Sequence, residues 1–527
     1  MYIEDYDTEE TVYDITAAGS GYASLNHTLE GMNLYYAENI SSEPEILEME
    51  IKNILGFANT FDKMNLYMVT SEGVLKYSLA DKTSSFIMKW ADSEISASPS
   101  DDSLYITSSG NLVWSAFEGN KYKVFLYSEA DEETADRVKS KEILTVACDG
   151  TKDFIKRAVA EFNRTNSDFR IEINDYEKYS QSHKDNTVYD KMNLDIVSGN
   201  LPDIVIGGNN IDISHFSRMG MFADLNRYFE NDSEFDRSDF FGNILESYSS
   251  DGKQYCIPLN IFINAVLCRE NVPGKENSWT FDEFFSADSL FYETSREDMV
   301  KYLITENLDE YVDFSVMKCS FDDIYFSKLL TYIKENAESE EEIMKILTTE
   351  NGYSEYRDRF INNTCNAELL NLQYADKLSE YSELSSFNLR GMPSESENIY
   401  PSVSSDSLIC ISEKSGHKDE AWKFIKLLMS EKYQDTIGEN SKHALQLSIR
   451  KDSFEKMMAD FASEAGTDTA EKLRKAVEYS NKAVLSDSRI TGIINEQCAL
   501  FFTDSQTIYE TVNNIQNQVR TYLMEIK

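Results

Sequence analysis

Positive charge, proline, histidine and cysteine are all scarce in this sequence. Its 527 residues include 7 Pro, 7 Cys, 5 His and 50 Lys plus Arg, against 93 Asp plus Glu. The resulting net charge of -43 repels nucleic acids and anionic lipid surfaces, which argues against nucleic acid as a partner. An acidic surface also simply keeps a protein soluble, so the charge assigns no function by itself.

The seven cysteines form no C-x-x-C pair and have no metal-like spacing. We interpret them as small buried hydrophobic residues. An oxidising export route would usually pair them, so the pattern in an exported protein is typical of an organism that makes few disulfides, as many Gram-positive bacteria do. The sequence predicts no metal site and no cofactor.

Long apolar runs are also missing. No stretch approaches the roughly 18 apolar residues of a membrane span, and the segment from Met1 to Asp5 has neither a basic nor an apolar signal region. We therefore expect a soluble chain, from which a signal segment has been removed if the protein is exported.

Aromatic residues are abundant: 31 Tyr and 29 Phe lie in a chain that is 41% hydrophobic, which predicts globular structure. At about 150 residues per domain, the length suggests three or four units. Residues 1–20, with Glu4, Asp5, Asp7, Glu9 and Glu10, are expected to be an acidic tail or linker.

Residues 21–140 show short β runs broken by polar turns. Three runs are alike, at 32–36, 64–69 and 103–107, with tyrosines 32 and 38 residues apart. This spacing is typical of β-propeller blades, although three blades are too few to close a ring. We expect either truncated blades, with at least two four-stranded sheets, or an ordinary irregular β domain.

After the charged run 131–141, which is read as a domain boundary, the pattern changes to alternating strands and helices. Apolar strands are expected at 143–147, 169–173 and 203–206. Before each of the last two we expect a helix whose apolar residues lie on one face. This β-α-β-α-β order predicts a parallel sheet with a ligand crevice at the carboxyl ends of its strands.

Several blocks occur in an order similar to that of the carbohydrate-type extracellular solute-binding proteins of ABC importers. They are EFNRTN at 161–166, GNLPDIV at 199–205, MGMFADL at 219–225 and DGKQYCIP at 251–258. Later blocks are WTFDE at 279–283, with Thr280 as helix N-cap and Glu283 at N3, SEKSGHKDEAWKFI at 412–425, and the final helix ending in YLME at 522–525. The resemblance covers residues 142–527.

The resemblance implies an α/β two-lobed clamp of the type II periplasmic-binding-protein fold, preceded by the all-β, propeller-like module. Lobe one would hold 142–259 and 405–440, and lobe two 264–400 and 445–527. The protein would capture a sugar or oligosaccharide by hinge closure and deliver it to the membrane subunits of the importer. It would be extracellular, monomeric, and anchored as a lipoprotein in its full-length form.

Sugar binding uses aromatic faces and paired hydrogen-bonding side chains. Such groups follow the predicted strands, and on the crossover at 260–264 polar and aromatic residues alternate with isoleucines. Each could instead be a core or turn residue. The expected ligand-binding residues are Asp149, Tyr176, Tyr179, Asn209, Asn210, Asn260, Phe262, Asn264, Gln373, Tyr374, Tyr400 and Ser404.

Two other functions stay open at this point. A glycan hydrolase would need positioned acidic residues, but the sequence contains no G-x-S-x-G, H-E-x-x-H, Walker or dinucleotide motif, so we expect no catalytic residues. A surface receptor or sensor-associated binding protein would use the same clamp without transport. The sequence does not separate transport from sensing.

Overall fold

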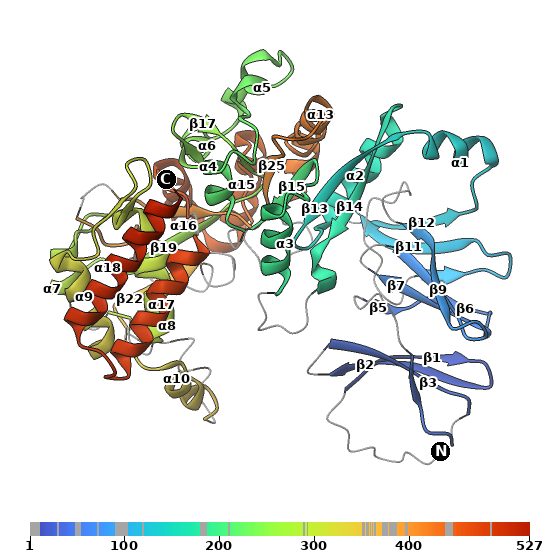
Figure 1. Ribbon diagram of the computed structural model, residues 1–527, viewed down its shortest axis with the longest axis horizontal. Coiled ribbons are helices and arrows are strands. Elements are labelled where there is room, and N and C mark those ends of the chain that lie inside the picture. Colours follow the sequence, from blue (N-terminus) through green and yellow to red (C-terminus); the bar gives the residue numbers. More distant parts are fainter. Residues whose placement is uncertain are drawn as a thin grey trace. The chain divides into compact units, whose positions relative to one another are not determined.

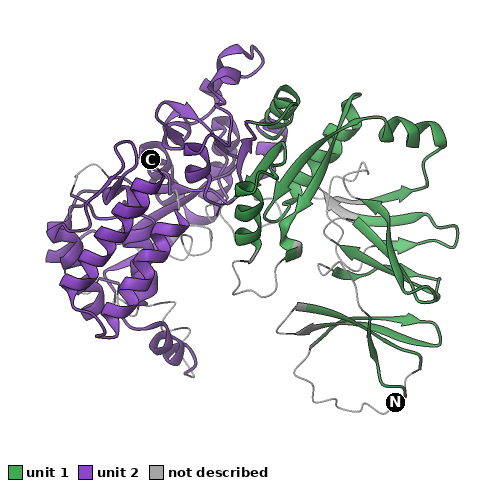
Figure 2. Ribbon diagram, in the orientation of Figure 1, with its two compact units in different colours: residues 1–207, 414–428 green, residues 208–413, 429–527 purple. Residues whose placement is uncertain are grey.

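The computed structural model describes residues 11–28, 31–39, 41–47, 54–70, 73–89, 104–118, 121–179, 187–208, 211–287, 290–291, 294–349, 352, 354, 358, 360, 362, 365–371, 378, 387–395, 399–437, 446–484 and 487–526. The chain forms two compact units, shown in Figure 2. The first consists of residues 1–207 and 414–428, and the second of residues 208–413 and 429–527.

The first unit begins with three four-stranded sheets in its described part. Sheet one has the order β1-β2-β3-β4, sheet two β5-β7-β8-β9 and sheet three β12-β11-β10-β6 (Figure 1). Their strands are β1 Thr11–Ala18, β2 Gly21–Thr28, β3 Gly31–Ala37, β4 Glu45–Leu47, β5 Ile54–Phe57, β6 Asn59–Thr60, β7 Asn65–Thr70, β8 Gly73–Ser78, β9 Thr83–Lys89, β10 Leu104–Ile106, β11 Leu112–Glu118 and β12 Lys121–Tyr127.

These sheets meet the expectation of at least two four-stranded sheets in this region. The three tyrosine-containing runs fall in β3, β7 and β10, so each belongs to a different sheet. Sheets one and two share a buried cluster that includes Leu34 and Met68, and sheets two and three share another that includes Val74 and Trp114. Successive sheets are therefore joined by apolar packing.

The prediction of an acidic tail over residues 1–20 is wrong for Thr11–Ala18, which form β1 and pair antiparallel with β2. Val12 and Ile15 are β-branched and suit a strand, a β-bulge lies between Val12 and Asp14, and pairing with β2 forms the strand in spite of the local acidity. Residues 1–10 lie outside the described residues. The charged run after β12 forms a helix, α1 Glu132–Lys139, which Asp131 caps by accepting from the Thr134 N–H.

A parallel three-stranded array follows, as predicted. β13 Glu142–Cys148 pairs parallel with both β14 Phe169–Asp175 and β15 Ile204–Gly207. α2 Asp153–Thr165 and α3 Thr187–Val197 form the connections. α13 Lys418–Leu428 returns to pack on α2, with the Phe162 and Phe424 rings 5.8 Å apart, and buries the predicted face of Ala421, Phe424, Ile425 and Leu428.

The second unit is mainly helical around a sheet of order β22-β19-β23, with β24 also paired to β19. Its principal strands are β18 Ile257–Pro258, β19 Phe262–Arg269, β22 Ala367–Asn371, β23 Phe387–Arg390, β24 Ser402–Ser404 and β25 Leu408–Ile411. Its helices include α4 Ile213–Arg218, α5 Asn226–Asn231, α6 Gly242–Ser247, α7 Phe281–Ser286, α8 Arg296–Val300, α9 Ile324–Asn336, α10 Glu340–Leu347, α14 Glu431–Gln434, α15 Lys451–Ala465, α16 Thr467–Tyr479, α17 Ser488–Phe502 and α18 Ile508–Glu525.

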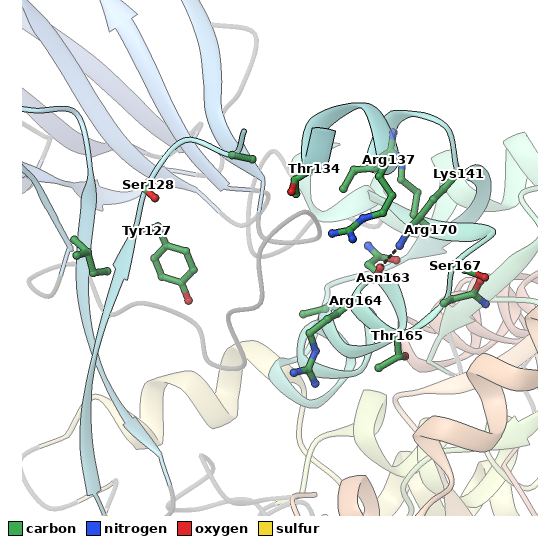
Figure 3. A pocket seen from close by; sticks show the side chains of 15 residues that line it. Tyr127, Ser128, Thr134, Arg137, Lys141, Asn163, Arg164, Thr165, Ser167 and Arg170 are labelled. Atoms are coloured by element: carbon green, nitrogen blue, oxygen red, sulfur yellow. Dashed lines mark hydrogen bonds between the residues drawn. The ribbon is translucent and has the colours of Figure 1, made fainter. Parts of the chain in front are cut away.

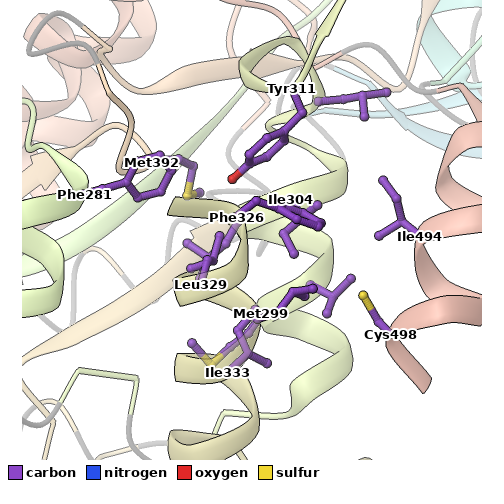
Figure 4. Close-up of a cluster of buried hydrophobic side chains, with 14 of the residues drawn as sticks. Phe281, Met299, Ile304, Tyr311, Phe326, Leu329, Ile333, Met392, Ile494 and Cys498 are labelled. Atoms are coloured by element: carbon purple, nitrogen blue, oxygen red, sulfur yellow. The ribbon is translucent and has the colours of Figure 1, made fainter. Parts of the chain in front are cut away.

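One large apolar cluster holds this unit together. Side chains of α9, α17 and the π-helical turn Lys301–Thr305 meet in it, and Figure 4 shows Ile494 and Cys498 of α17 facing Ile304 and Met299. The predicted face of α18 also joins it through Val512, Ile515, Val519 and Leu523. The core therefore connects segments that lie far apart in the sequence.

The sequence blocks that carry the resemblance stabilise a loop, a helix N-terminus and a turn of the fold. Asp203 accepts hydrogen bonds from Thr145 N at 2.9 Å and from Ser415 Oγ at 2.6 Å, which links two strands to the loop before α13. Thr280 and Glu283 form the predicted capping box of α7. At Asp251-Gly252 both residues have positive φ, as the tight turn between Ser249–Ser250 and Lys253–Gln254 requires.

All seven cysteines are free, and six are buried while Cys319 is half-buried. Their interpretation as hydrophobic residues is confirmed for the buried six. Within the described part of the chain, no helix is long and apolar enough to cross a membrane.

Candidate functional site

The carboxyl ends of β13 and β14 form the first group of candidate residues. Asp149, which follows β13, is half-buried, and Asp175, at the end of β14, is 2% exposed. Asp175 accepts hydrogen bonds from Thr151 N at 3.0 Å, Thr151 Oγ1 at 2.7 Å and Glu177 N at 2.9 Å. Asp175 therefore shapes both loops at this sheet edge. Sequence reasoning did not select it, although its position at a strand end was a signal.

Tyr176 and Tyr179 lie next to each other after β14, with ring centroids 5.6 Å apart. The Tyr176 hydroxyl donates to Asp195 Oδ2 at 2.9 Å, and Lys191 Nζ donates to Asp195 Oδ1. Burial, and next the Asp195 carboxylate, raises the pKa of Tyr176. Tyr176 is thus a buried support, whereas Tyr179 is 38% exposed and presents its ring at the surface.

Asn260 belongs to a buried polar network in the second unit. Its Nδ2 donates to Asp406 Oδ1 at 2.7 Å, and its Oδ1 accepts from Ser405 Oγ at 3.1 Å. Ser407 Oγ also donates to Asp406 Oδ1 at 3.0 Å. Both ends of the Asn260 amide are therefore used to join the segment before β19 to the segment between β24 and β25.

A third segment adjoins the same place. Ile261 and Leu447 exchange backbone hydrogen bonds of 2.9 Å in both directions. Gln434 donates from its Nε2 to the Leu259 carbonyl at 3.1 Å, and its Oε1 accepts from Ser448 Oγ at 2.6 Å. Three stretches that are distant in sequence thus lie side by side around residues 259–261.

Asn264 and Ser404 occupy one face of the β19 sheet. Asn264 is directly paired with Asn371 of β22 and with Ser402 of β24, and Phe262 is paired with Ser404. Directly opposed residues and residues two apart project from the same face of a sheet. The structure therefore brings Phe262, Asn264 and Ser404 together, and adds one residue that the sequence did not suggest, Ser402.

The polar atoms on this face are short of partners. Asn264 is 1% exposed and Ser404 is 6% exposed, yet neither amide atom of Asn264 nor the Ser404 hydroxyl has a hydrogen-bond partner within the described structure. Leaving a buried amide unpaired costs about 1–3 kcal/mol per group. An unsatisfied buried group in a native protein calls for an explanation, and a ligand or an ordered water that completes its hydrogen bonds is one.

Tyr400 is the remaining predicted binding residue that the structure describes. Tyr400 is half-buried and its ring stacks on Tyr479 with a centroid distance of 5.8 Å. Asn209, Asn210, Gln373 and Tyr374 lie outside the described residues. Among the residues that are described, no cluster of three or more His, Cys, Asp or Glu side chains has the geometry to hold a metal ion.

Several solved structures have folds similar to that of this chain. Two solved structures that cover 73% of this chain are the ABC substrate-binding protein Lmo0181 from Listeria monocytogenes in complex with cycloalternan, at 15% identity, 100% coverage of that chain and a TM-score of 0.50, and the sugar-binding protein MalE from Xanthomonas citri, at 16% identity, 98% coverage and a TM-score of 0.51. A periplasmic oligogalacturonide binding protein from Yersinia enterocolitica aligns similarly, at 14% identity over 73% of this chain and 99% of its own, with a TM-score of 0.50.

These neighbours have the type II periplasmic-binding fold predicted from the sequence, while the N-terminal β-sheets are an addition to it. The sequence comparison with curated proteins gave no match. The family profile described as bacterial extracellular solute-binding protein matches residues 149–435, which is more than half of the chain. The chain therefore belongs to the bacterial extracellular solute-binding proteins.

Proposed function

We propose that this protein is the substrate-binding component of an ABC importer and that it captures a carbohydrate between two lobes. The observation that carries the proposal is the face of β19, where the Asn264 amide and the Ser404 hydroxyl are buried without described partners beside the Phe262 ring. Sugars offer adjacent hydroxyls to amides and an apolar ring face to aromatics. A peptide or amino acid would instead call for charged groups at this face.

Proteins of the same fold support this ligand class. The Listeria protein was solved with cycloalternan, the Xanthomonas protein is described as sugar-binding, and the Yersinia protein is described as binding oligogalacturonides. These descriptions belong to those proteins, and we extend only the class of ligand to this chain.

We propose the binding residues in two groups. Asp149 and Tyr179 would contact the ligand, with Tyr176 holding Tyr179 in place through their ring contact. The second group of proposed ligand contacts comprises Phe262, Asn264, Ser404 and Tyr400, together with the predicted Asn209, Asn210, Gln373 and Tyr374. Asn260 would act on the hinge, because its amide is already paired with Asp406 and Ser405.

The predicted lobes, 142–259 with 405–440 and 264–400 with 445–527, would move about the three segments that adjoin Asn260. Hinge closure is driven by contacts that exist only in the closed state. We further propose that the N-terminal sheets are truncated propeller-like blades, and that the full-length protein is a monomeric, lipid-anchored extracellular receptor in a Gram-positive organism.

A thermal-shift panel tests the ligand class directly. The purified chain is heated with mono- and oligosaccharides, and with amino acids and short peptides as controls. A ligand at 100 times its Kd stabilises by about 2.7 kcal/mol. Stabilisation by one sugar class supports the proposal, whereas stabilisation only by peptides or amino acids would refute it.

Binding without turnover separates a receptor from an enzyme. The sugar that stabilises the protein is incubated with it for a day and the products are analysed by chromatography. An unchanged sugar is expected, because the family to which the chain belongs is one of solute-binding proteins. Release of shorter saccharides would favour the glycan hydrolase instead.

A further inference from the structure

A cavity of about 650 Å³ lies within the first unit, apart from the residues discussed above. It is lined by the end of β12 and the segment after it, by helix α1, by the end of α2 with the loop that follows, and by Arg170 of β14 (Figure 3). None of the fifteen described residues that line it is Asp or Glu, although the chain has 93 of them. Four lining residues are basic: Arg137, Lys141, Arg164 and Arg170.

Arg137 and Arg164 are the exposed members of the basic group, and the charge of Arg137 also acts on the nearby Asp131 carboxylate. Both are exposed, and within the described part of the chain neither guanidinium group makes a hydrogen bond or ion pair. Figure 3 shows both guanidinium groups extending from their helices toward the side on which Tyr127 lies. Both groups are therefore available to a ligand in the cavity.

Lys141 and Arg170 form the inner part of the basic group. Lys141 Nζ donates to the Asn163 carbonyl at 2.5 Å, and Arg170 Nη2 lies 2.5 Å from Glu172 Oε1. Burial, and then the charges of Arg137 and Arg170, lowers the pKa of Lys141. Arg137 and Arg170 thus repel Lys141, the Asp168 carboxylate offsets part of this repulsion, and a bound anion would relieve the rest.

Helix ends explain only part of this arrangement. Basic side chains near the last turns of α1 and α2 interact favourably with the helix dipoles, and Lys141 follows this rule by binding the Asn163 carbonyl. Arg170 lies on β14, however, and dipole stabilisation does not require the lining to be empty of carboxylates in so acidic a chain. The cavity therefore has the character of an anion site.

We propose that this cavity binds a ligand that carries phosphate groups, through Arg137, Arg164 and Arg170. Guanidinium groups match the oxygen geometry of phosphate with paired, charge-assisted hydrogen bonds. Thr134 and Ser167 also line the cavity and add hydroxyl groups, of which that of Ser167 donates to Asp168 Oδ2 at 2.9 Å. The volume suits a small phosphorylated molecule or a short stretch of a phosphodiester polymer. Binding here is independent of the proposed sugar site.

Calorimetric titration of the whole chain tests this proposal. Inorganic pyrophosphate represents the small ligand, and a short synthetic poly(glycerol phosphate) represents the polymer. The double variant R137Q/R164Q removes two cavity cations, and the control K63Q/K139Q removes two exposed cations outside the cavity, with the same change in net charge.

Saturable binding of at least one probe is expected, with Kd raised at least about tenfold in R137Q/R164Q and less than about twofold in K63Q/K139Q. Preference for pyrophosphate would identify a small solute as the ligand, and preference for the polymer would identify a phosphodiester chain. Absence of saturable binding to either probe, or equal weakening in both double variants, would overturn the proposal. Thermal unfolding of each variant verifies that it is folded.

Discussion

Asn260 Nδ2 donates to Asp406 Oδ1 across 2.7 Å, although the two residues are 146 positions apart in the sequence. Asn260 is fully buried, and its Oδ1 is occupied by Ser405. This contact joins two of the three segments that the proposed hinge comprises. It also distinguishes Asn260 from Asn264, four residues later, whose amide is buried without a described partner.

Replacing Asn260 with Ala should lower the free energy of unfolding by about 1–3 kcal/mol, because Asp406 and Ser405 lose their buried partner. Urea denaturation followed by circular dichroism measures this change. The control is Gln518→Ala on the exposed side of α18, for which we expect less than about 0.5 kcal/mol. Equal effects of the two substitutions would contradict a structural role for Asn260.

Asn264→Leu, unlike Asn260→Ala, should not destabilise the folded protein. Removing an unpaired buried amide should leave the free energy of unfolding unchanged or raise it by about 1 kcal/mol, while the stabilisation by sugar disappears. Thermal shift with and without the sugar that binds the unmodified protein gives both quantities. A strongly destabilised variant would mean that the amide has a structural partner in the unliganded protein.

Glu306 should make stability depend on pH. Burial raises its pKa to about 7, with Lys301 opposing this and Asp298 adding to it. A folded-state pKa above the unfolded value means that the folded protein binds the proton more tightly. The contribution of Glu306 is therefore most favourable at low pH and declines between about pH 4.5 and 7, by up to about 3 kcal/mol.

Glu306→Gln keeps the side chain uncharged, so it should raise the free energy of unfolding at pH 8 and flatten its decline between pH 5 and 7. Chemical denaturation at several pH values measures both effects. Glu335→Gln, at an exposed position of α9, should reproduce the pH profile of the unmodified protein. If the free energy of unfolding of Glu306→Gln depends on pH as that of the unmodified protein does, a group other than Glu306 causes the dependence.

Ile494→Ala tests the core of the second unit. Ile494 is fully buried between α17 and the π-helical turn (Figure 4), so its truncation should cost about 2–5 kcal/mol through lost burial and a new cavity. Thermal and urea unfolding measure the loss. Ile324→Ala is the matched control, because Ile324 is 63% exposed, and its effect should stay within about 0.5 kcal/mol.

Local patterns determined much of this protein. Apolar periodicity predicted the β-α-β-α-β order from β13 to β15, the buried face of α13 and that of α18, because both periodicities are set by backbone geometry alone. Thr280 and Glu283 predicted a capping box, because this motif depends only on residues that are close in the sequence. The ordered motifs were enough to indicate the family, and the family match over residues 149–435 confirmed it.

Tertiary structure alone decided the rest. The segment 11–18 looked like a charged tail, but pairing with β2 makes it a strand. Asn260 and Asn264 were equivalent in the sequence, both polar and on the same alternating run. Asp406 and Ser405 form hydrogen bonds with the amide of Asn260, whereas the amide of Asn264 has no hydrogen-bond partner among the described residues. The partners of a buried amide come from distant segments, so no local pattern can specify which amide is satisfied within the fold and which is not.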